Sequence, residues 1–229
     1  MKKIFFGALF LLSSLLMNAQ RINKVTLSNN GSSYSITYLL DQNVVLNISQ
    51  DGTIAEWGVD KYASRPVDFT QHKLDPFEGK VEYYTDKDND AFKGKIKYIG
   101  RTLISYYAST DKDYQVGKIK SVGPAKFDYY TNADDPMAIG KLKVSGSMNF
   151  TYFSSYENDA LKGKVKSAGN VPFTYYSSFD DKVIAGKFKS VNGGAFTYYM
   201  NQEQNFAKGS LKTGRMIQVI NGVTYFIKN

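Results

Sequence analysis

The stretch GKVKSAGNVPFTYYSSFDD, from Gly163 to Asp181, decides the fold of this chain. Nearly the same stretch precedes it as GKLKVSGSMNFTYFSSYEN and follows it as GKFKSVNGGAFTYYMNQEQ. Its Gly-Lys pair recurs every 23 residues, at Gly94, Gly117, Gly140, Gly163 and Gly186, and Gly209 keeps the spacing with Ser210 in the lysine position. Paired aromatic residues keep the same period from Tyr83 to Tyr199. A constant period in this range predicts a stacked array of structural repeats.

Each repeat has the pattern of two short strands joined by a turn. The segment Gly-Lys-apolar-Lys alternates in polarity, as does Phe-x-Tyr-Tyr, and this two-residue period is typical of strands. A glycine between them permits the positive φ of a tight turn. The alternation predicts that Val165, Phe173 and Tyr175 form an apolar ladder on one face. Lysines and the second tyrosine row would occupy the other face, although the pattern alone does not decide which tyrosine row is buried.

The sequence divides into a leader, a non-repeating segment and the array. Residues 1–19 have Lys2 and Lys3, then an apolar run, which is the layout of a secretory signal peptide with cleavage near Ala19–Gln20. Residues 20–68 are predicted to form an N-terminal β cap segment of four strands. Residues 69–229 are predicted to form the repeat array. Only the second half of its first unit matches the repeat pattern, and its last unit, 207–229, is predicted to be a capping hairpin. The predicted fold is all-β, an elongated antiparallel sheet or β-solenoid of tandem hairpins.

Composition limits the partners. The chain has no cysteine, so an exported form would be held together without disulfides. Removal of Lys2 and Lys3 leaves 27 basic and 21 acidic residues, a net charge of +6. We expect a localisation in the periplasm, at the cell surface or outside the cell. A protein, a glycan or an anionic surface are the expected partners; nucleic acid is not, and membrane contact would be peripheral.

The repeats resemble the MORN family. The stretch Ile184-Ala185-Gly186-Lys187-Phe188, followed by a glycine turn and Phe196-Thr197-Tyr198, is similar to the aromatic-x-Gly-x-aromatic core of its 23-residue β-hairpins. The position two residues before the glycine is usually aromatic in that family, and here it is Ala138, Leu161 or Ile184. The later Gly-x-Gly is missing, so the chain is MORN-like. The resemblance implies a scaffold or contact surface, and it brings no catalytic residue.

Motifs for catalysis or cofactor binding are weak. No Gly-Lys is followed by Ser or Thr, as a phosphate-binding loop requires. Asp86, Asp88 and Asp90 copy the start of a calcium loop, but Ala91 stands where glycine is needed and Lys97 where a bidentate Glu is needed. His72 is the only histidine. We therefore expect no enzyme, no cofactor and no metal site.

The lysine pairs are the strongest candidates for ligand binding. Neighbouring repeats would place them roughly 10 Å apart, or two strand spacings. The candidate residues are Lys95, Lys97, Lys118, Lys120, Lys141, Lys143, Lys164, Lys166, Lys187, Lys189, Tyr107, Tyr130, Tyr176 and Tyr199. The expected function is a non-catalytic interaction or structural module of the bacterial-type envelope or cell surface. The alternative is binding of carbohydrate, such as an acidic glycan, or of lipid headgroups through this Lys/Tyr ladder.

Overall fold

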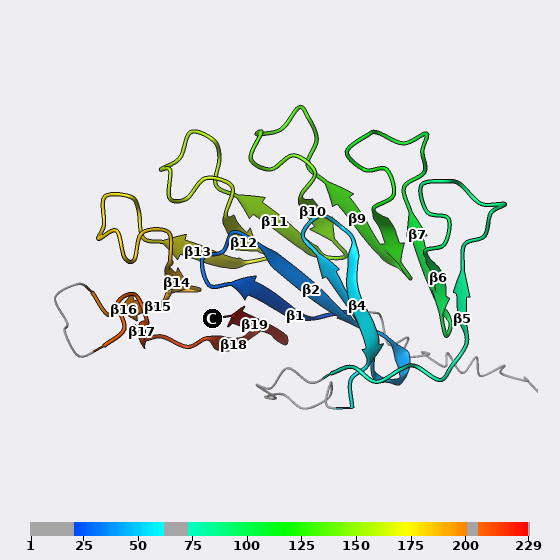
Figure 1. Cartoon of the computed structure of the whole chain (residues 1–229), viewed down its shortest axis with the longest axis horizontal. Coiled ribbons are helices and arrows are strands. Elements are labelled where there is room, and N and C mark those ends of the chain that lie inside the picture. The colour runs from blue at the N-terminus through cyan, green and yellow to red at the C-terminus, as the bar shows by residue number, and fades with distance from the viewer. Residues whose placement is uncertain (1–20, 62–72, 201–205, 229) are drawn as a thin grey trace, which may run out of the picture.

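The computed structural model describes residues 21–61, 73–200 and 206–228, and in them the fold is all-β (Figure 1). A six-stranded sheet has the order β18-β19-β1-β2-β3-β4. An eleven-stranded sheet runs without crossover from β15 back to β5, and β16 and β17 form a small third sheet. One short 3-10 turn, η1 (Asp41–Asn43), is the helical element of the described part. The predicted fold class, all-β with large antiparallel sheets, is confirmed.

The repeat period in the sequence is also the period of the structure. The first strands of the repeats are β6 (Ile96–Ile99), β8 (Ile119–Val122), β10 (Leu142–Ser145), β12 (Val165–Ala168) and β14 (Phe188–Val191). The second strands are β5 (Val81–Tyr83), β7 (Thr102–Tyr106), β9 (Ala125–Tyr129), β11 (Met148–Tyr152), β13 (Val171–Tyr175), and the pair β15 (Gly194–Ala195) and β16 (Thr197–Tyr198). β17 (Leu211–Thr213) pairs with β16. Each first strand therefore begins just after Gly-Lys.

A β-bulge lies at every junction between repeats. Thr151 pairs with Ser167, whereas the next residue, Tyr152, pairs with Val165. Lys166 is therefore the extra residue on its strand, and the same shift recurs at the equivalent junctions. Bulges re-aim side chains and leave backbone groups outside the ladder. Here the bulge sends the two lysines of a pair to different neighbours, which the plain alternation of the sequence did not predict.

The N-terminal and C-terminal strands build the second layer. The four predicted N-terminal strands form as β1 (Arg21–Ser28), β2 (Tyr34–Leu39), β3 (Val44–Ser49) and β4 (Ile54–Val59). The predicted C-terminal hairpin forms as β18 (Ile217–Ile220) and β19 (Val223–Lys228). Its position differs from the expected cap, because β19 pairs in parallel with β1. Both ends of the described chain thus share one sheet, which lies against the strands of the repeats (Figure 1).

The core lies between the two layers. The Tyr34 ring stacks on Phe150 with centroids 4.9 Å apart, and Tyr38 packs against Phe127 at 5.6 Å. The C-terminal hairpin contributes Tyr225, which is 6.2 Å from Phe173. Buried rings of this size contribute a few kcal/mol each at about 25 cal/mol per Å². Removal of this aromatic layer from water is the physical reason that the end segments cover the face of the array instead of capping its end.

The predicted apolar ladder is confirmed in the covered face. Val165, Phe173 and Tyr175 are all buried, as are their counterparts in the central repeats except Tyr152, which is partly buried. The buried tyrosine row is therefore the first of each Tyr-Tyr pair. The phenols of Tyr106, Tyr129, Tyr152 and Tyr175 each donate to a carbonyl of their own hairpin; for example, Tyr175 Oη donates to Val165 O at 2.8 Å. A buried hydroxyl without such a partner would be costly.

Two glycine turns of the six-stranded sheet dock on the repeats. The Val165 amide donates to Gly31 O at 3.2 Å, and the Ile119 amide donates to Gly52 O at 3.1 Å. Both glycines have positive φ, of +66° and +83°. A Cβ on Gly31 would overlap the Tyr175 ring, which is held by its own hydrogen bond. Glycine is thus needed at Gly31 both for its backbone conformation and for its contact.

We expect Gly31→Ala to destabilise the protein more than Gly222→Ala. Both positions have left-handed φ, so both variants carry a strain of about 1–2 kcal/mol. Nothing lies within 4 Å of a Cβ at Gly222, whereas a Cβ at Gly31 meets Tyr175. Overpacking there should add about 1–3 kcal/mol. Urea unfolding measures the difference, and equal losses for the two variants would contradict the docking of this turn.

Candidate functional site

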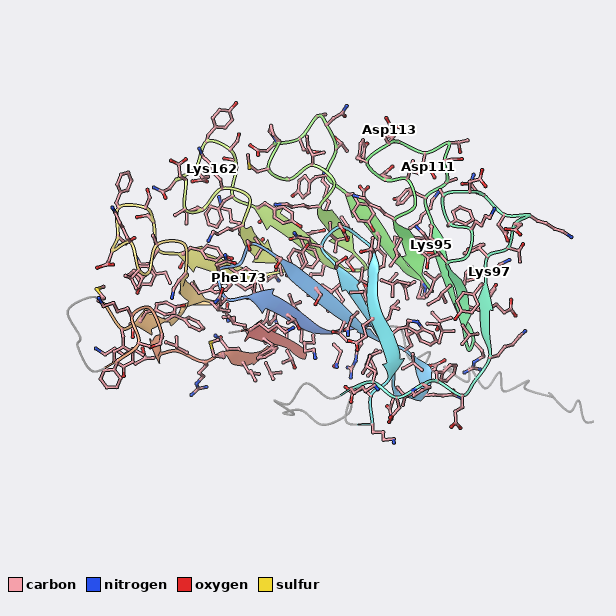
Figure 2. The ribbon with its side chains drawn as sticks, in the orientation of Figure 1. Lys95, Lys97, Asp111, Asp113, Lys162 and Phe173 are labelled. Atoms are coloured by element: carbon pink, nitrogen blue, oxygen red, sulfur yellow. The ribbon has the colours of Figure 1, made fainter. Side chains whose placement is uncertain are left out.

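The candidate lysines form two rows with different surroundings. We call Lys95, Lys118, Lys141, Lys164 and Lys187 the inner lysines, and Lys97, Lys120, Lys143, Lys166 and Lys189 the outer lysines. Figure 2 shows one member of each row, Lys95 and Lys97, at the same end of the repeat sheet. The expected single Lys/Tyr face is thus divided, because the inner lysines contact the buried tyrosine row and the outer lysines the second aromatic row.

Each inner lysine joins its repeat to the next one. Lys141 Nζ lies 5.0 Å from the centroid of the Tyr152 ring and donates to Gly163 O at 2.6 Å. The other four inner lysines repeat both contacts, with centroid distances of 4.9 to 5.2 Å and a hydrogen bond to the glycine carbonyl 22 residues later. We call this arrangement the lysine–glycine contact. Because the contact joins each lysine to the glycine 22 residues later, it requires the constant 23-residue spacing of the Gly-Lys pairs.

Burial shifts the titration of the inner lysines. Loss of solvation lowers the pKa values of Lys95, Lys118, Lys141 and Lys187 below their ordinary range. It lowers the pKa of Lys164 to about 8. The Lys164 ammonium has a second acceptor, Asn30 O at 2.9 Å, in the β1–β2 turn. These ammonium groups donate hydrogen bonds to carbonyls of the protein. They therefore have fewer N–H donors left for an external anion.

The outer lysines are more accessible. Lys120 lies over the Tyr107 ring of the preceding repeat at 5.1 Å, and Lys143 lies over Tyr130 at the same distance. Their side chains keep 51% and 42% of their accessible surface. Loop carboxylates approach them, with Lys143 Nζ 3.7 Å from Asp134. Exposed pairs of this kind contribute at most about 1 kcal/mol, so an anionic ligand would displace these carboxylates at a small cost.

The candidate tyrosines also connect repeats. Tyr107 Oη donates to Phe127 O, Tyr130 Oη to Phe150 O, and Tyr176 Oη to Phe196 O, at 2.8 to 2.9 Å. Tyr199 instead stacks on Phe206 with centroids 4.0 Å apart. The hydroxyls of Tyr107, Tyr130 and Tyr176 thus each bond a carbonyl of the next repeat. A ligand that stacks on these rings would therefore have to leave their bonds to the next repeat intact.

The acidic loops have a local structural role. The Asp134 carboxylate accepts hydrogen bonds from the amide and hydroxyl of Thr131, and these bonds lower the pKa of Asp134. Asp88 does the same for Thr85. Asp86, from the partial calcium pattern, pairs with Lys93 at 3.1 Å. In the described ranges, no group of three or more His, Cys, Asp or Glu side chains could hold a metal ion. Figure 2 shows Asp111 and Asp113 on one of these protruding loops.

Two exposed rings on the loops escaped the sequence reasoning. Tyr156 and Phe179 are 95% and 93% exposed, and they occupy equivalent positions in neighbouring repeats. Their loops are linked, because Ser178 N donates to Asn158 Oδ1 at 2.8 Å and Asn158 Nδ2 donates to Ser178 Oγ. The signal was an aromatic residue inside an otherwise polar link.

Several predictions lie outside the described residues. They are the signal peptide with its cleavage near Ala19–Gln20, and His72. Within the part of the chain that is described, no helix has the length and apolar character needed to cross a membrane.

Comparison with known proteins gives no relative. No family model matches the chain, and no curated protein or solved structure shows significant similarity to it.

We expect Lys141→Met to destabilise the protein more than Lys143→Met. Met at 141 keeps the aliphatic length but leaves Gly163 O without its donor, at a cost of about 1–3 kcal/mol. Met at 143 removes an exposed cation over Tyr130, worth roughly 0.5–1 kcal/mol. Urea unfolding of the two variants checks this order. A larger loss from Lys143→Met would contradict the division into inner and outer rows.

We expect the folded protein to lose stability as the pH rises above 10. Burial raises the pKa of Tyr38, Tyr198 and Tyr225 to about 12, and it also raises the pKa values of Tyr129 and Tyr175. Unfolded tyrosine ionises near pH 10, so the unfolded chain loses protons first. The stabilisation is complete below pH 10 and is lost as the pH rises through the folded values.

Parallel measurement of tyrosinate absorbance and far-ultraviolet circular dichroism tests this titration. The buried tyrosines should ionise together with unfolding. Titration of all tyrosines near pH 10 with intact strand signal would contradict it.

Proposed function

We propose that this chain is an exported, non-catalytic repeat protein that serves as an interaction or structural module of the bacterial-type envelope or cell surface. We also propose that its array is MORN-like, a β-solenoid of hairpins whose face is covered by the end segments. The signal-peptide layout of residues 1–19 supports export. The lysine–glycine contacts support a mechanical role for the repeat motif, because they tie each hairpin to the next.

The observation that carries the proposal is the exposed aromatic pair on the loops. Tyr156 and Phe179 are almost fully solvated, although each ring has 150–250 Å² to bury. Covering both against a partner would contribute several kcal/mol at about 25 cal/mol per Å². Aromatic residues are enriched at interface centres for this reason. The loop hydrogen bonds between Asn158 and Ser178 preorganise the two rings, which lowers the entropic cost of binding.

The alternative function, binding of an acidic glycan or anionic lipid, would use the outer lysines. Lys120 and Lys166 retain about half of their side-chain surface, at 51% and 53%. Both have a loop carboxylate within 4.0 Å, Asp111 and Glu157. An anionic ligand would have to compete with those carboxylates. The exposed aromatic pair has no such competitor among its cited contacts, so we favour the interaction module over binding of an anionic ligand.

The test measures binding of the purified mature chain to envelopes of the organism that produces it. We expect the double variant Tyr156→Ser/Phe179→Ser to lose binding at least tenfold with unchanged unfolding stability, because exposed rings do not support the core. The matched control is Ala133→Ser, at the equivalent exposed position one repeat earlier. Unchanged binding by the double variant would overturn the proposal.

A second set of variants separates the alternative. The triple variant Lys120→Glu/Lys143→Glu/Lys166→Glu should leave envelope binding intact if the aromatic loops carry it. Loss in this variant alone, together with salt-sensitive binding to acidic glycans or anionic vesicles, would favour the alternative function. Inner lysines are unsuitable for such a test, because their substitution breaks the lysine–glycine contact.

A further inference from the structure

Three consecutive repeats each have an equivalent backbone amide that binds a carbonyl from another part of the same chain. Because of the bulge, the amide of the residue after each inner lysine points out of the ladder. The Ile119 amide donates to Gly52 O at 3.1 Å, the Leu142 amide to Gln50 O at 2.8 Å, and the Val165 amide to Gly31 O at 3.2 Å. All three acceptors belong to turns of the six-stranded sheet. The repeat motif therefore acts as a receptor for turn carbonyls.

The two turns that dock have the same construction. Both have Ser at the first position and an Asx-Gly pair at the third and fourth, as Ser28 to Gly31 and Ser49 to Gly52. In each, the glycine amide donates to the serine carbonyl, and the serine hydroxyl donates to the Asx Oδ1. In each, the glycine lies so close to the buried tyrosine that a Cβ would overlap the ring. Two independent turns thus indicate that the site binds a Ser-x-Asx-Gly turn through its glycine.

The first copy of this site has no such turn over it. Lys95, Ile96, Tyr106 and Gly117 are its counterparts of Lys118, Ile119, Tyr129 and Gly140. Across the described ranges, no turn carbonyl accepts the Ile96 amide. These residues line an open cavity of about 320 Å³, together with Gly52, Thr53, Ile54, Ala55, Glu56, Trp57 and Gly94. The cavity lies beside β4, the last strand of the six-stranded sheet.

We propose that this cavity binds an exposed Asx-Gly turn of a partner polypeptide. The turn would place its glycine carbonyl on the Ile96 amide and its glycine Cα on the Tyr106 ring, as Gly52 does on Ile119 and Tyr129. This inference rests on the proposed interaction function and gives it a second contact surface, distinct from the aromatic loops.

Charge favours aspartate over asparagine in the bound turn. In the occupied copy, burial alone would raise the pKa of Asp51, but hydrogen bonds from Ser49 and Thr53 and the charge of Lys118 hold it below its ordinary value. Lys95 is the matching cation in the first copy, over the Tyr106 ring at 5.2 Å. Glu56 is the carboxylate among the lining residues and is itself exposed. An Asp-Gly turn therefore has a complementary charge at the position where Asp51 has one.

The experiment uses a cyclic peptide that contains Ser-Gln-Asp-Gly-Thr, the sequence of residues 49–53, and the full mature chain. Trp57, the single tryptophan, lines the cavity and reports binding by its fluorescence. We expect a saturable change with a low-millimolar or tighter Kd. The same peptide with Ala in place of Gly should bind at least tenfold more weakly, because its Cβ would meet the tyrosine ring.

Matched variants separate the turn site from a simple anion site. The peptide with Asn in place of Asp should bind at least tenfold more weakly, because it lacks the charge that faces Lys95, and Lys97→Met, in the outer row over Tyr84, should leave binding unchanged. Absence of a saturable signal, equal binding of the Ala peptide, or equally tight binding of N-acetylaspartate would overturn the proposal. The Tyr156→Ser/Phe179→Ser variant should keep full peptide binding, so failure of this proposal and failure of the proposed function of the aromatic loops are distinguishable.

Discussion

The bond from each inner lysine to the glycine carbonyl of the next repeat is the interaction on which the array depends. It places a cation between a buried tyrosine ring and a backbone oxygen, at each of five successive junctions. The glycine must be glycine, because its φ is positive and the ammonium fills the space of a side chain; at Gly186 a Cβ would lie 2.7 Å from Lys164 Nζ. Spacing, charge and aromatic position are thus consequences of one contact.

That contact also determines which surfaces remain for function. Inner lysines and the second tyrosine row are used within the array, so a row of charge in the sequence is not a row of free charge in the molecule. Besides the outer lysines, the groups that remain exposed are at the periphery, as Tyr156 and Phe179 on the loops and the cavity beside Trp57. A rigid sheet that displays peripheral contact groups is the arrangement expected of a binding scaffold.

The repeat period and its alternation predict most of the fold. The hairpins, the buried ladder of Val165, Phe173 and Tyr175, and the strands at both ends all follow from patterns of two and 23 residues. The parallel pairing of β19 with β1 does not, because no local pattern encodes a contact between the chain ends. The bulge at Lys166 was also hidden, since one extra residue leaves the polarity pattern unchanged while it redirects a side chain. The division of the lysines follows from that bulge.

Observation of the lysine ammonium groups by ¹H–¹⁵N NMR tests whether the inner lysines are bonded to the glycine carbonyls. Hydrogen-bonded, half-buried ammonium protons exchange slowly with water, whereas exposed ones exchange too fast to give a signal near neutral pH. We expect resolved ammonium signals from Lys118, Lys141 and Lys164, each removed by the corresponding Lys→Met variant, and none from Lys120, Lys143 and Lys166. Signals from both rows, or from neither, would contradict it.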